Sequence, residues 1–195
     1  MAAVTAVLAS GNPHKLEELR AALPGWELEL LETDADYPPE DGATFEANAR
    51  AKARFGRRHA RADEWVLGED SGIEVAALDG GPGIHSARYG GGGSGKERLL
   101  VELGGAADRR ARYVCTIVAI GPEGEEVVVV GTLAGSVADE QRGSEGFGYD
   151  PIFVPDGETR TVAELGNAWK RTNSHRARAA AALAAALSEA DGSGV

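Results

Sequence analysis

The stretch Trp65-Val66-Leu67-Gly68-Glu69-Asp70-Ser71-Gly72 places two adjacent carboxylates directly after a short apolar run. The apolar residues predict a buried strand, and Ser71-Gly72 predicts a tight turn in which a ligand can approach the backbone closely. Neighbouring carboxylates disfavour each other's ionisation, and a divalent cation removes that penalty. The stretch therefore predicts either a metal-binding turn or an ordinary solvated acidic turn, since acidic residues are mostly exposed.

Strand and helix patterns alternate on both sides of this stretch. The expected strands lie at residues 5–9, 26–31, 65–67, 73–77, 111–120 and 127–137, and the expected helices lie at 13–23, 44–59, 94–103 and 174–187. Asn12 is a good N-cap for the first helix, and Pro13 fits its first position. The last two strands, joined by a Gly-Pro-Glu-Gly turn, predict a β-hairpin. No internal repeat or low-complexity linker splits the 195 residues, so one domain is expected.

Composition excludes several classes of protein. The net charge of −11 argues against binding of nucleic-acid polymers, which requires a basic face, but it is compatible with a small phosphorylated ligand. Cys115 is the one cysteine, so no intramolecular disulfide can form, and its apolar neighbours predict a small buried side chain. No run approaches ~20 apolar residues, so a cytoplasmic protein with no membrane partner is expected.

Cations stand at two helix starts, where the helix dipole disfavours them. Ser10-Gly11-Asn12-Pro13-His14-Lys15 joins the first strand to the first helix, and backbone N–H groups at such a junction can bind an anion. Lys15 is therefore either a phosphate ligand or a surface lysine on an ordinary strand–helix junction. His175 and Arg176 open the last helix after its predicted N-cap, and together with Lys170 they are expected to face a polar ligand.

Gly146-Phe147-Gly148-Tyr149-Asp150-Pro151 sets two aromatic side chains between glycines beside a carboxylate. Aromatic side chains on such a turn can stack on a nucleobase, and the alternative is that they simply fill the core.

The segment from Gly90 to Lys96 matches the glycine and lysine spacing of a P-loop. Glu97 follows where a P-loop needs Ser or Thr, and the preceding residues 82–86 do not predict a strand. A P-loop is therefore rejected.

Six segments, taken in order, closely resemble those of the inosine/xanthosine triphosphate pyrophosphatases, which remove nonstandard purine nucleotides from the nucleotide pool. The matching segments are 10–15, 44–52, 69–72, 81–89, 146–151 and 174–176. The resemblance implies an α/β fold that is elongated and two-lobed, with a central mixed β-sheet flanked by helices and a long active-site cleft. It implies that residues 1–195 form one pyrophosphatase domain, with two lobes around that cleft, and that the protein is a homodimer.

The resemblance also implies a role for each matching residue. Asp70 would be the general base, and Mg²⁺ would be held by Glu40, Glu69 and Asp70. The phosphates would be bound by Ser10, Gly11, Asn12, Pro13, His14, Lys15, Lys52 and Ser71. The base would be bound by Phe147, Gly148, Tyr149, Asp150, Lys170, His175 and Arg176. The stretch 165–173 departs from the family's usual glutamate-lysine-asparagine pattern around Lys170.

The implied reaction is hydrolysis of ITP, dITP or XTP to a nucleoside monophosphate and pyrophosphate. A triphosphate carries about four negative charges, which magnesium and lysines must neutralise before water can attack. Hypoxanthine and xanthine present an acceptor at the six position, which Arg176 or Lys170 can meet as a donor, whereas adenine presents a donor. Two rival hypotheses remain: a nucleotide-binding regulatory module without turnover, and a pyrophosphatase for modified pyrimidine nucleotides or methylated bases.

Overall fold

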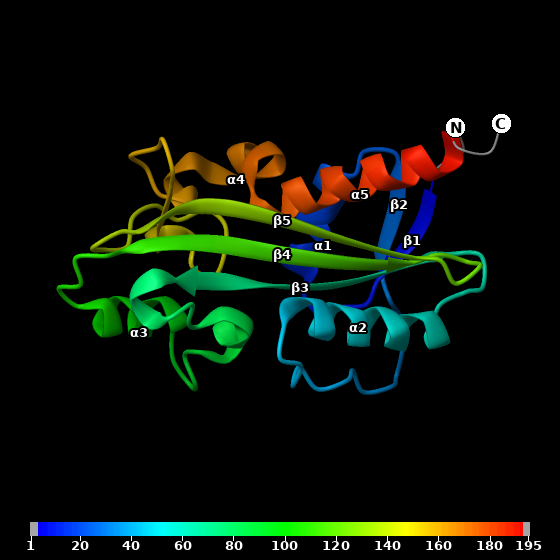
Figure 1. Ribbon diagram of the computed structural model, residues 1–195, viewed down its shortest axis with the longest axis horizontal. Helices are drawn as coiled ribbons and strands as arrows, with labels where there is room; N and C mark the ends of the chain where they lie inside the picture. The colour runs from blue at the N-terminus through cyan, green and yellow to red at the C-terminus, as the bar shows by residue number, and fades with distance from the viewer. Residues whose placement is uncertain (1–3, 193–195) are drawn as a thin grey trace. The chain divides into compact units, whose positions relative to one another are not determined.

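The chain folds as an alternation of strands and helices, and the computed structural model describes residues 4–192. Its strands are β1 (Val4–Leu8), β2 (Trp26–Leu30), β3 (Trp65–Val75), β4 (Arg110–Ile120), β5 (Glu126–Val137) and β6 (Phe153–Pro155). Its α-helices are α1 (Pro13–Ala22), α2 (Phe45–His59), α3 (Gly95–Leu103), α4 (Val162–Asn173) and α5 (His175–Gly192). The described strands form one sheet in the order β2-β1-β3-β4-β5-β6 (Figure 1). β1 is parallel to β2 and β3, whereas β5 and β6 are antiparallel, so the fold is α/β with a mixed sheet.

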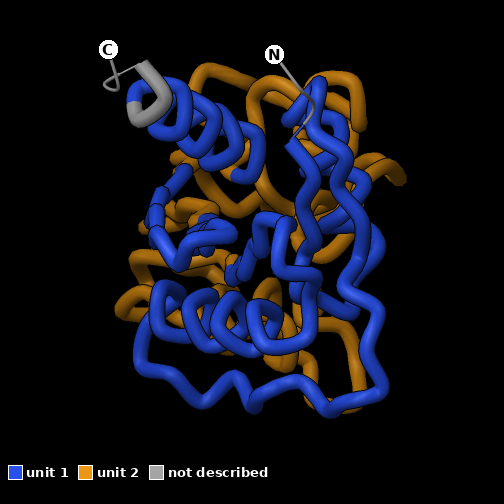
Figure 2. Tube along the Cα trace, turned by 90° about the vertical axis from the view of Figure 1, so that its right-hand side faces the viewer, with its two compact units in different colours: residues 1–70, 115–131, 176–195 blue, residues 71–114, 132–175 orange. Residues whose placement is uncertain are grey.

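The chain divides into two compact units (Figure 2). Unit 1 comprises residues 1–70, 115–131 and 176–195, and unit 2 comprises residues 71–114 and 132–175. The strands β3, β4 and β5 each contribute residues to both units.

Helices cover both faces of the sheet in unit 1. On one face α1 and α5 share an apolar cluster with the strands, in which Leu19, Leu67 and Leu183 are fully buried. On the opposite face lies α2 (Figure 1). It buries Phe55 against Val66 in a separate cluster. Full burial of each such side chain stabilises the fold by about 1.5–3 kcal/mol, so these clusters hold the helices against the strands.

The alternation of side chains along β3 determines which helix each residue meets. Val66 faces α2 and Leu67 faces α1 and α5, because successive strand residues point to opposite faces. Gly68 points toward α2, and a Cβ atom there would lie 2.0 Å from the carbonyl oxygen of Ala49 and 2.5 Å from the amide nitrogen of Ala53. A glycine at this position therefore allows α2 to lie against β3.

Unit 2 has a core of its own, rich in aromatic side chains. The rings of Tyr113 and Phe153 stack with their centroids 4.1 Å apart inside a buried cluster that includes residues of α3 and α4. α4 begins with a capping box, in which Thr161 Oγ1 accepts from the Glu164 amide and the Glu164 carboxylate accepts from the Thr161 amide. Two backbone groups that the helix leaves without partners are thereby satisfied.

The predicted acidic turn is wrong. Residues 65–75 form the single strand β3, so the expected strands at 65–67 and 73–77 are one, and Ser71-Gly72 lies inside it. The apolar alternation continues through the polar residues, since Ile73 and Val75 are fully buried in the core of unit 2. Burial of both ends therefore keeps the intervening acidic residues extended.

Most other element predictions are confirmed within one or two residues, including the Asn12 cap, the second and third helices and the hairpin of β4 and β5. The segment before Gly90 is a 3-10 helix, Gly83–Arg88, which agrees with the rejection of a P-loop. α4 and β6 were not predicted, although Thr161 and Glu164 have the spacing of a capping box. Within residues 4–192, no helix combines the length and apolar character needed to cross a membrane.

Candidate active site

The loop after β1 leads into α1 as predicted. Ser10 Oγ accepts a hydrogen bond from the Asn12 amide at 3.1 Å, and Asn12 Oδ1 accepts from the amide two residues on at 3.0 Å. Lys15, in the first helical turn, extends its ammonium to Glu69, with 2.6 Å between Nζ and Oε2. The other members of the predicted phosphate loop, Gly11, Pro13 and His14, are exposed.

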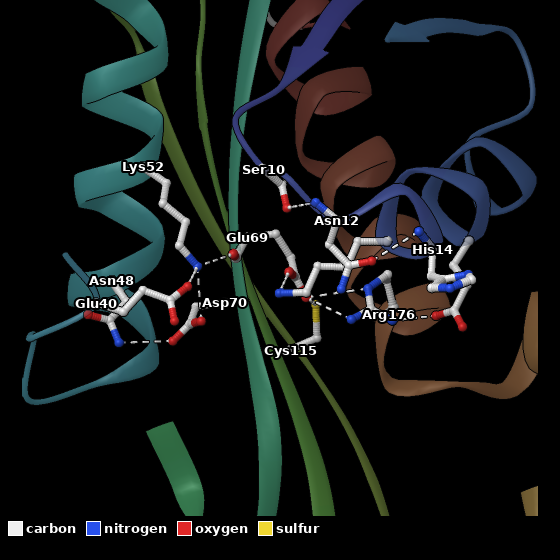
Figure 3. A network of polar contacts seen from close by, with 12 residues as sticks. Ser10, Asn12, His14, Glu40, Asn48, Lys52, Glu69, Asp70, Cys115 and Arg176 are labelled. Atoms are coloured by element: carbon white, nitrogen blue, oxygen red, sulfur yellow. Dashed lines mark hydrogen bonds and ion pairs between the residues drawn. The ribbon is translucent and has the colours of Figure 1, made fainter. Parts of the chain in front are cut away.

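Asp70 points to the α2 face of β3 (Figure 3). Its Oδ2 accepts a hydrogen bond from Asn48 Nδ2 at 3.0 Å, and its Oδ1 lies 3.1 Å from Lys52 Nζ. The same ammonium is paired with Glu40 and donates to the backbone carbonyl of Glu69 at 3.0 Å. The spacing of four residues places Asn48 and Lys52 on one face of α2, and the close packing at Gly68 brings that face to Asp70.

The environment of Asp70 changes the proton affinity of both partners. Burial raises the pKa of Asp70 above its ordinary value, although Lys52 and Asn48 favour the ionised form. Burial acts to lower the pKa of Lys52, but Asp70 and Glu40 outweigh it and raise that pKa above its ordinary value. Asp70 is thus a buried carboxylate with more affinity for a proton than an exposed aspartate, and it lies beside a lysine that stays charged.

Glu69 points to the opposite face of β3, toward α1 and α5 (Figure 3). Its Oε1 accepts from Arg176 Nη2 at 3.0 Å and from Arg176 Nε and Cys115 Sγ, each at 3.3 Å. Its Oε2 is paired with Lys15. A further nitrogen of Arg176, Nη1, donates to Glu18 of α1.

The pKa of Glu69 is shifted in the opposite direction from that of Asp70. Burial alone would raise the pKa of Glu69, but Lys15 and Arg176 hold it well below its ordinary value. The pKa of Arg176 is raised, because Glu69 and Glu18 outweigh the effect of its burial. The pKa of the Cys115 thiol is raised by burial and by Glu69, so it stays a thiol. Glu69 is therefore held ionised between two cations.

The three predicted metal ligands do not form one cluster. Glu40 and Asp70 meet at Lys52, whereas the carboxylate of Glu69 lies on the other face of β3. In the described part of the chain, no group of three or more His, Cys, Asp or Glu residues could hold a metal ion. Two carboxylates that converge on one ammonium nevertheless fit Mg²⁺, which proteins bind through one or two carboxylates together with substrate phosphates. The chemistry of this pair of side chains fits the ion, and Glu69 is outside the pair.

In unit 2, Asp150 organises part of the predicted base-binding group. Its Oδ2 is 2.6 Å from Lys170 Nζ and accepts from the Phe147 amide at 2.8 Å, and its Oδ1 accepts from the Tyr113 hydroxyl at 3.3 Å. Lys170 Nζ also lies 4.5 Å from the centroid of the Phe147 ring, as in a cation–π contact. A Cβ atom at Gly146, whose φ is +76°, would lie 2.2 Å from Asp150 Oδ2, so this turn requires glycine.

The remaining predicted residues of unit 2 have varied surroundings. Tyr149 is buried and donates to the Ser86 carbonyl at 2.8 Å, which favours the core-filling interpretation of this side chain. Phe147 is only half-buried. His175 lies against the ring of Tyr113, with the centroids 4.7 Å apart, and Ser71 is a half-buried residue of β3.

Sequence reasoning missed four residues that take part in these contacts, namely Glu18, Asn48, Ser86 and Tyr113. Glu18 lies three residues after Lys15 and Asn48 four residues before Lys52, so helical spacing from a predicted ligand is a signal for both. Ser86 lies in the matching segment 81–89, to which no role was assigned. Tyr113 comes from a distant strand, and nothing local to its sequence marks it.

Two relatives and two solved structures resemble the chain over nearly its whole length. A dITP/XTP pyrophosphatase from Deinococcus deserti is 44% identical over 92% of this chain and 88% of that protein, and one from Bdellovibrio bacteriovorus is 44% identical over 88% and 92%. Among solved structures, a HAM1 protein from Coxiella burnetii matches with a TM-score of 0.83 and 34% identity, covering 95% of this chain and 99% of that one. A nucleoside-triphosphatase / dITP/XTP pyrophosphatase from Mycobacterium abscessus matches with a TM-score of 0.71 and 43% identity, covering 92% and 97%.

The relatives are named dITP/XTP pyrophosphatases, and the two solved structures share the α/β fold of this chain. Residues 6–186 match the model of the Ham1 family, and the chain belongs to that family.

Proposed function

We propose that this protein hydrolyses nonstandard purine nucleoside triphosphates, namely ITP, dITP and XTP, to the monophosphate and pyrophosphate. The names of its relatives support the reaction and the substrates. The observation that carries the proposal is the position of Asp70, a buried carboxylate that contacts Asn48 and Lys52. The preceding residue of the same strand, Glu69, contacts Lys15. Unit 1 thus contains two lysines, Lys15 and Lys52, that can bind the phosphates, and a carboxylate, Asp70, that can act as the general base.

In this proposal Asp70 accepts the proton of the attacking water. A carboxylate of raised pKa is a stronger base than an exposed aspartate, and Lys52 favours the ionised form of Asp70. Lys52 and Lys15 stabilise the negative charge of the phosphates. The backbone N–H groups of the loop at residues 10–15 bind a terminal phosphate at the start of α1.

Magnesium fits the site through Glu40 and Asp70. When bound, the ion would supply charge neutralisation of the triphosphate and would acidify water near Asp70. Lys52 contacts both of these carboxylates.

We assign recognition of the base to residues around Asp150 and at the start of α5. Phe147 is half-buried and can offer a ring face to a purine, while Lys170 and Arg176 are donors that suit an acceptor at the six position. His175, Tyr149 and Gly148 complete the proposed group. Ser71 is proposed to bind a phosphate beside Asp70.

We further propose a cytoplasmic homodimer. Light scattering on the purified protein should then give about twice the chain mass of 20.2 kDa.

A substrate panel tests the proposed function. Pyrophosphate release from ITP, dITP, XTP, ATP, GTP and modified pyrimidine nucleotides is measured with and without Mg²⁺. The proposal expects rapid release from the first three only, and only with the metal. Nucleotide binding without release would favour the regulatory module, and turnover confined to pyrimidine or methylated nucleotides would favour the other rival hypothesis.

A further inference from the structure

The carboxylate of Glu69 is completely buried and surrounded by charged side chains. Its side chain has no exposed surface, and both of its carboxylate oxygens have charged partners. Oε1 is shared by two nitrogens of Arg176 and by the Cys115 thiol, and Oε2 faces the Lys15 ammonium at 2.6 Å. A buried carboxylate with this set of donors already has the counter-charge that a metal would otherwise provide.

The direction of the side chain separates Glu69 from the acidic pair of Glu40 and Asp70. Asp70 faces α2, and Glu69 faces α1 and α5 (Figure 3). Because β3 is extended through both residues, a change of rotamer cannot bring the two carboxylates to the same face. Glu69 reaches Asp70's side of the strand only through its backbone carbonyl, which accepts from Lys52 at 3.0 Å.

Lys15 is the cation of this network that meets solvent. Its side chain is 14% exposed, whereas those of Glu69 and Arg176 are 0% and 2% exposed. The ion pair with Glu69 holds the ammonium 2.6 Å from Oε2, and because an ammonium has three donors, others remain for a phosphate. Glu18 holds the guanidinium of Arg176, and that guanidinium holds the carboxylate of Glu69.

We propose that Glu69 is a positioning residue, which holds Lys15 in place for a phosphate by means of a buried ion pair braced by Arg176 and takes no part in metal binding. The inference rests on the proposed function, because the phosphate is that of the triphosphate substrate. Loss of the carboxylate would leave the Lys15 ammonium without a fixed direction, and a misplacement of about 1 Å can lower a rate by about 100-fold.

The test compares Glu69→Gln with the wild type in kcat, in nucleotide affinity and in Mg²⁺ requirement. We expect kcat for ITP to fall by about 10- to 100-fold. The Kd of ITP in EDTA should change by less than about threefold, because the extra positive charge offsets the loss of orientation. The Mg²⁺ concentration for half-maximal rate should be unchanged. Glu64→Gln, at another buried glutamate of unit 1, is the matched control and should behave as the wild type.

Coupling to Lys15 distinguishes positioning from a general structural effect. In a Lys15→Met background, Glu69→Gln should lower kcat by less than about twofold, because the residue on which it acts is gone. Binding of Mn²⁺, followed by electron paramagnetic resonance, should be unchanged in Glu69→Gln and weakened by about tenfold or more in Asp70→Asn. Should the glutamine variant not fold, Glu69→Asp retains the charge but shortens its reach, and the same expectations for kcat, for its dependence on Lys15 and for Mn²⁺ binding apply to it.

Three results would overturn the inference: an unchanged kcat in Glu69→Gln, an equal loss of kcat with and without Lys15, or weakened Mn²⁺ binding in that variant. A wild-type enzyme that releases no pyrophosphate from ITP would instead refute the proposed function.

Discussion

Glu69 and Asp70 are neighbours in sequence and yet belong to different environments. Asp70 meets one ammonium and one amide, and burial raises its pKa. Glu69 meets a lysine and an arginine, and its pKa is held well below the ordinary value. Because successive strand residues point to opposite faces, two similar side chains have different proposed roles: Asp70 as the general base and Glu69 as a positioning residue. Adjacent acidic residues in a sequence form a pair only where the backbone turns between them.

The largest effect should follow from Asp70→Asn. This change keeps the size of the side chain and removes the proton acceptor, so kcat for ITP should fall by about 10²- to 10⁴-fold while nucleotide affinity stays largely intact. Steady-state kinetics together with calorimetric binding in EDTA would measure both quantities. Substantial residual turnover would reject Asp70 as the base.

For the free energy of unfolding, the loss of Glu69 should cost more than the loss of Asp70, the reverse of the order expected for kcat. Glu69→Ala leaves Lys15 and Arg176 without their shared counter-charge, and we expect the free energy of unfolding to fall by about 3–5 kcal/mol. Asp70→Asn relieves the burial of a charge and should cost less than about 1 kcal/mol. Urea unfolding of the two variants measures the difference, and a greater loss in Asp70→Asn would contradict the comparison.

Arg176 is paired with Glu69 and Glu18, and it is also one of the residues that we propose to bind the base. We expect Arg176→Ala to lower the ratio of kcat/KM for ITP over ATP by about tenfold, because a donor to the six position is lost. The matched control is Arg178→Ala, two residues further along α5 and exposed. An unchanged ratio in Arg176→Ala would confine Arg176 to the ion pairs with Glu69 and Glu18.

The smallest effect is expected at the capping box of α4, which belongs to unit 2. Hydrogen bonding to the Thr161 backbone lowers the pKa of Glu164 below its ordinary 4.5. The ionised Glu164 therefore stabilises the folded state at pH values above 4.5, the ordinary pKa. This stabilisation is lost as the pH falls through the lower pKa that Glu164 has in the folded state. Unfolding at a series of pH values should therefore show a shallower acid decline in Glu164→Gln than in the wild type. Thr161→Ala should cost roughly 1 kcal/mol at neutral pH, and the absence of any loss would show that the cap is dispensable.

Local signals in the sequence predicted much of this fold. The Asn12 cap, Pro13 and the glycine turn of the hairpin each act on neighbouring residues, and these elements lie where they were expected. The error at residues 69–72 arose because tertiary burial overrides local turn preference: Ile73 and Val75 are buried in unit 2 and keep β3 extended.

The candidate site was predictable in its residue types more than in its contacts. The motifs named Lys15, Lys52, Asp70 and Arg176 as candidates, and the structure places these side chains in contact with Glu69 or with each other. The motifs did not show that Glu69 and Asp70 face different helices. That fact depends on β3 being continuous, which only the packing of the distant residues determines. Glu18 and Asn48 were missed because helical spacing suggests a neighbour without showing which side chain it will meet.

Hydrolysis of ITP in water enriched in ¹⁸O tests the central claim most directly, because it shows which phosphorus is attacked by the water that Asp70 is proposed to deprotonate. The account predicts that the label appears in the inosine monophosphate and is absent from the pyrophosphate. Label found in the pyrophosphate, with none in the nucleotide, would contradict it.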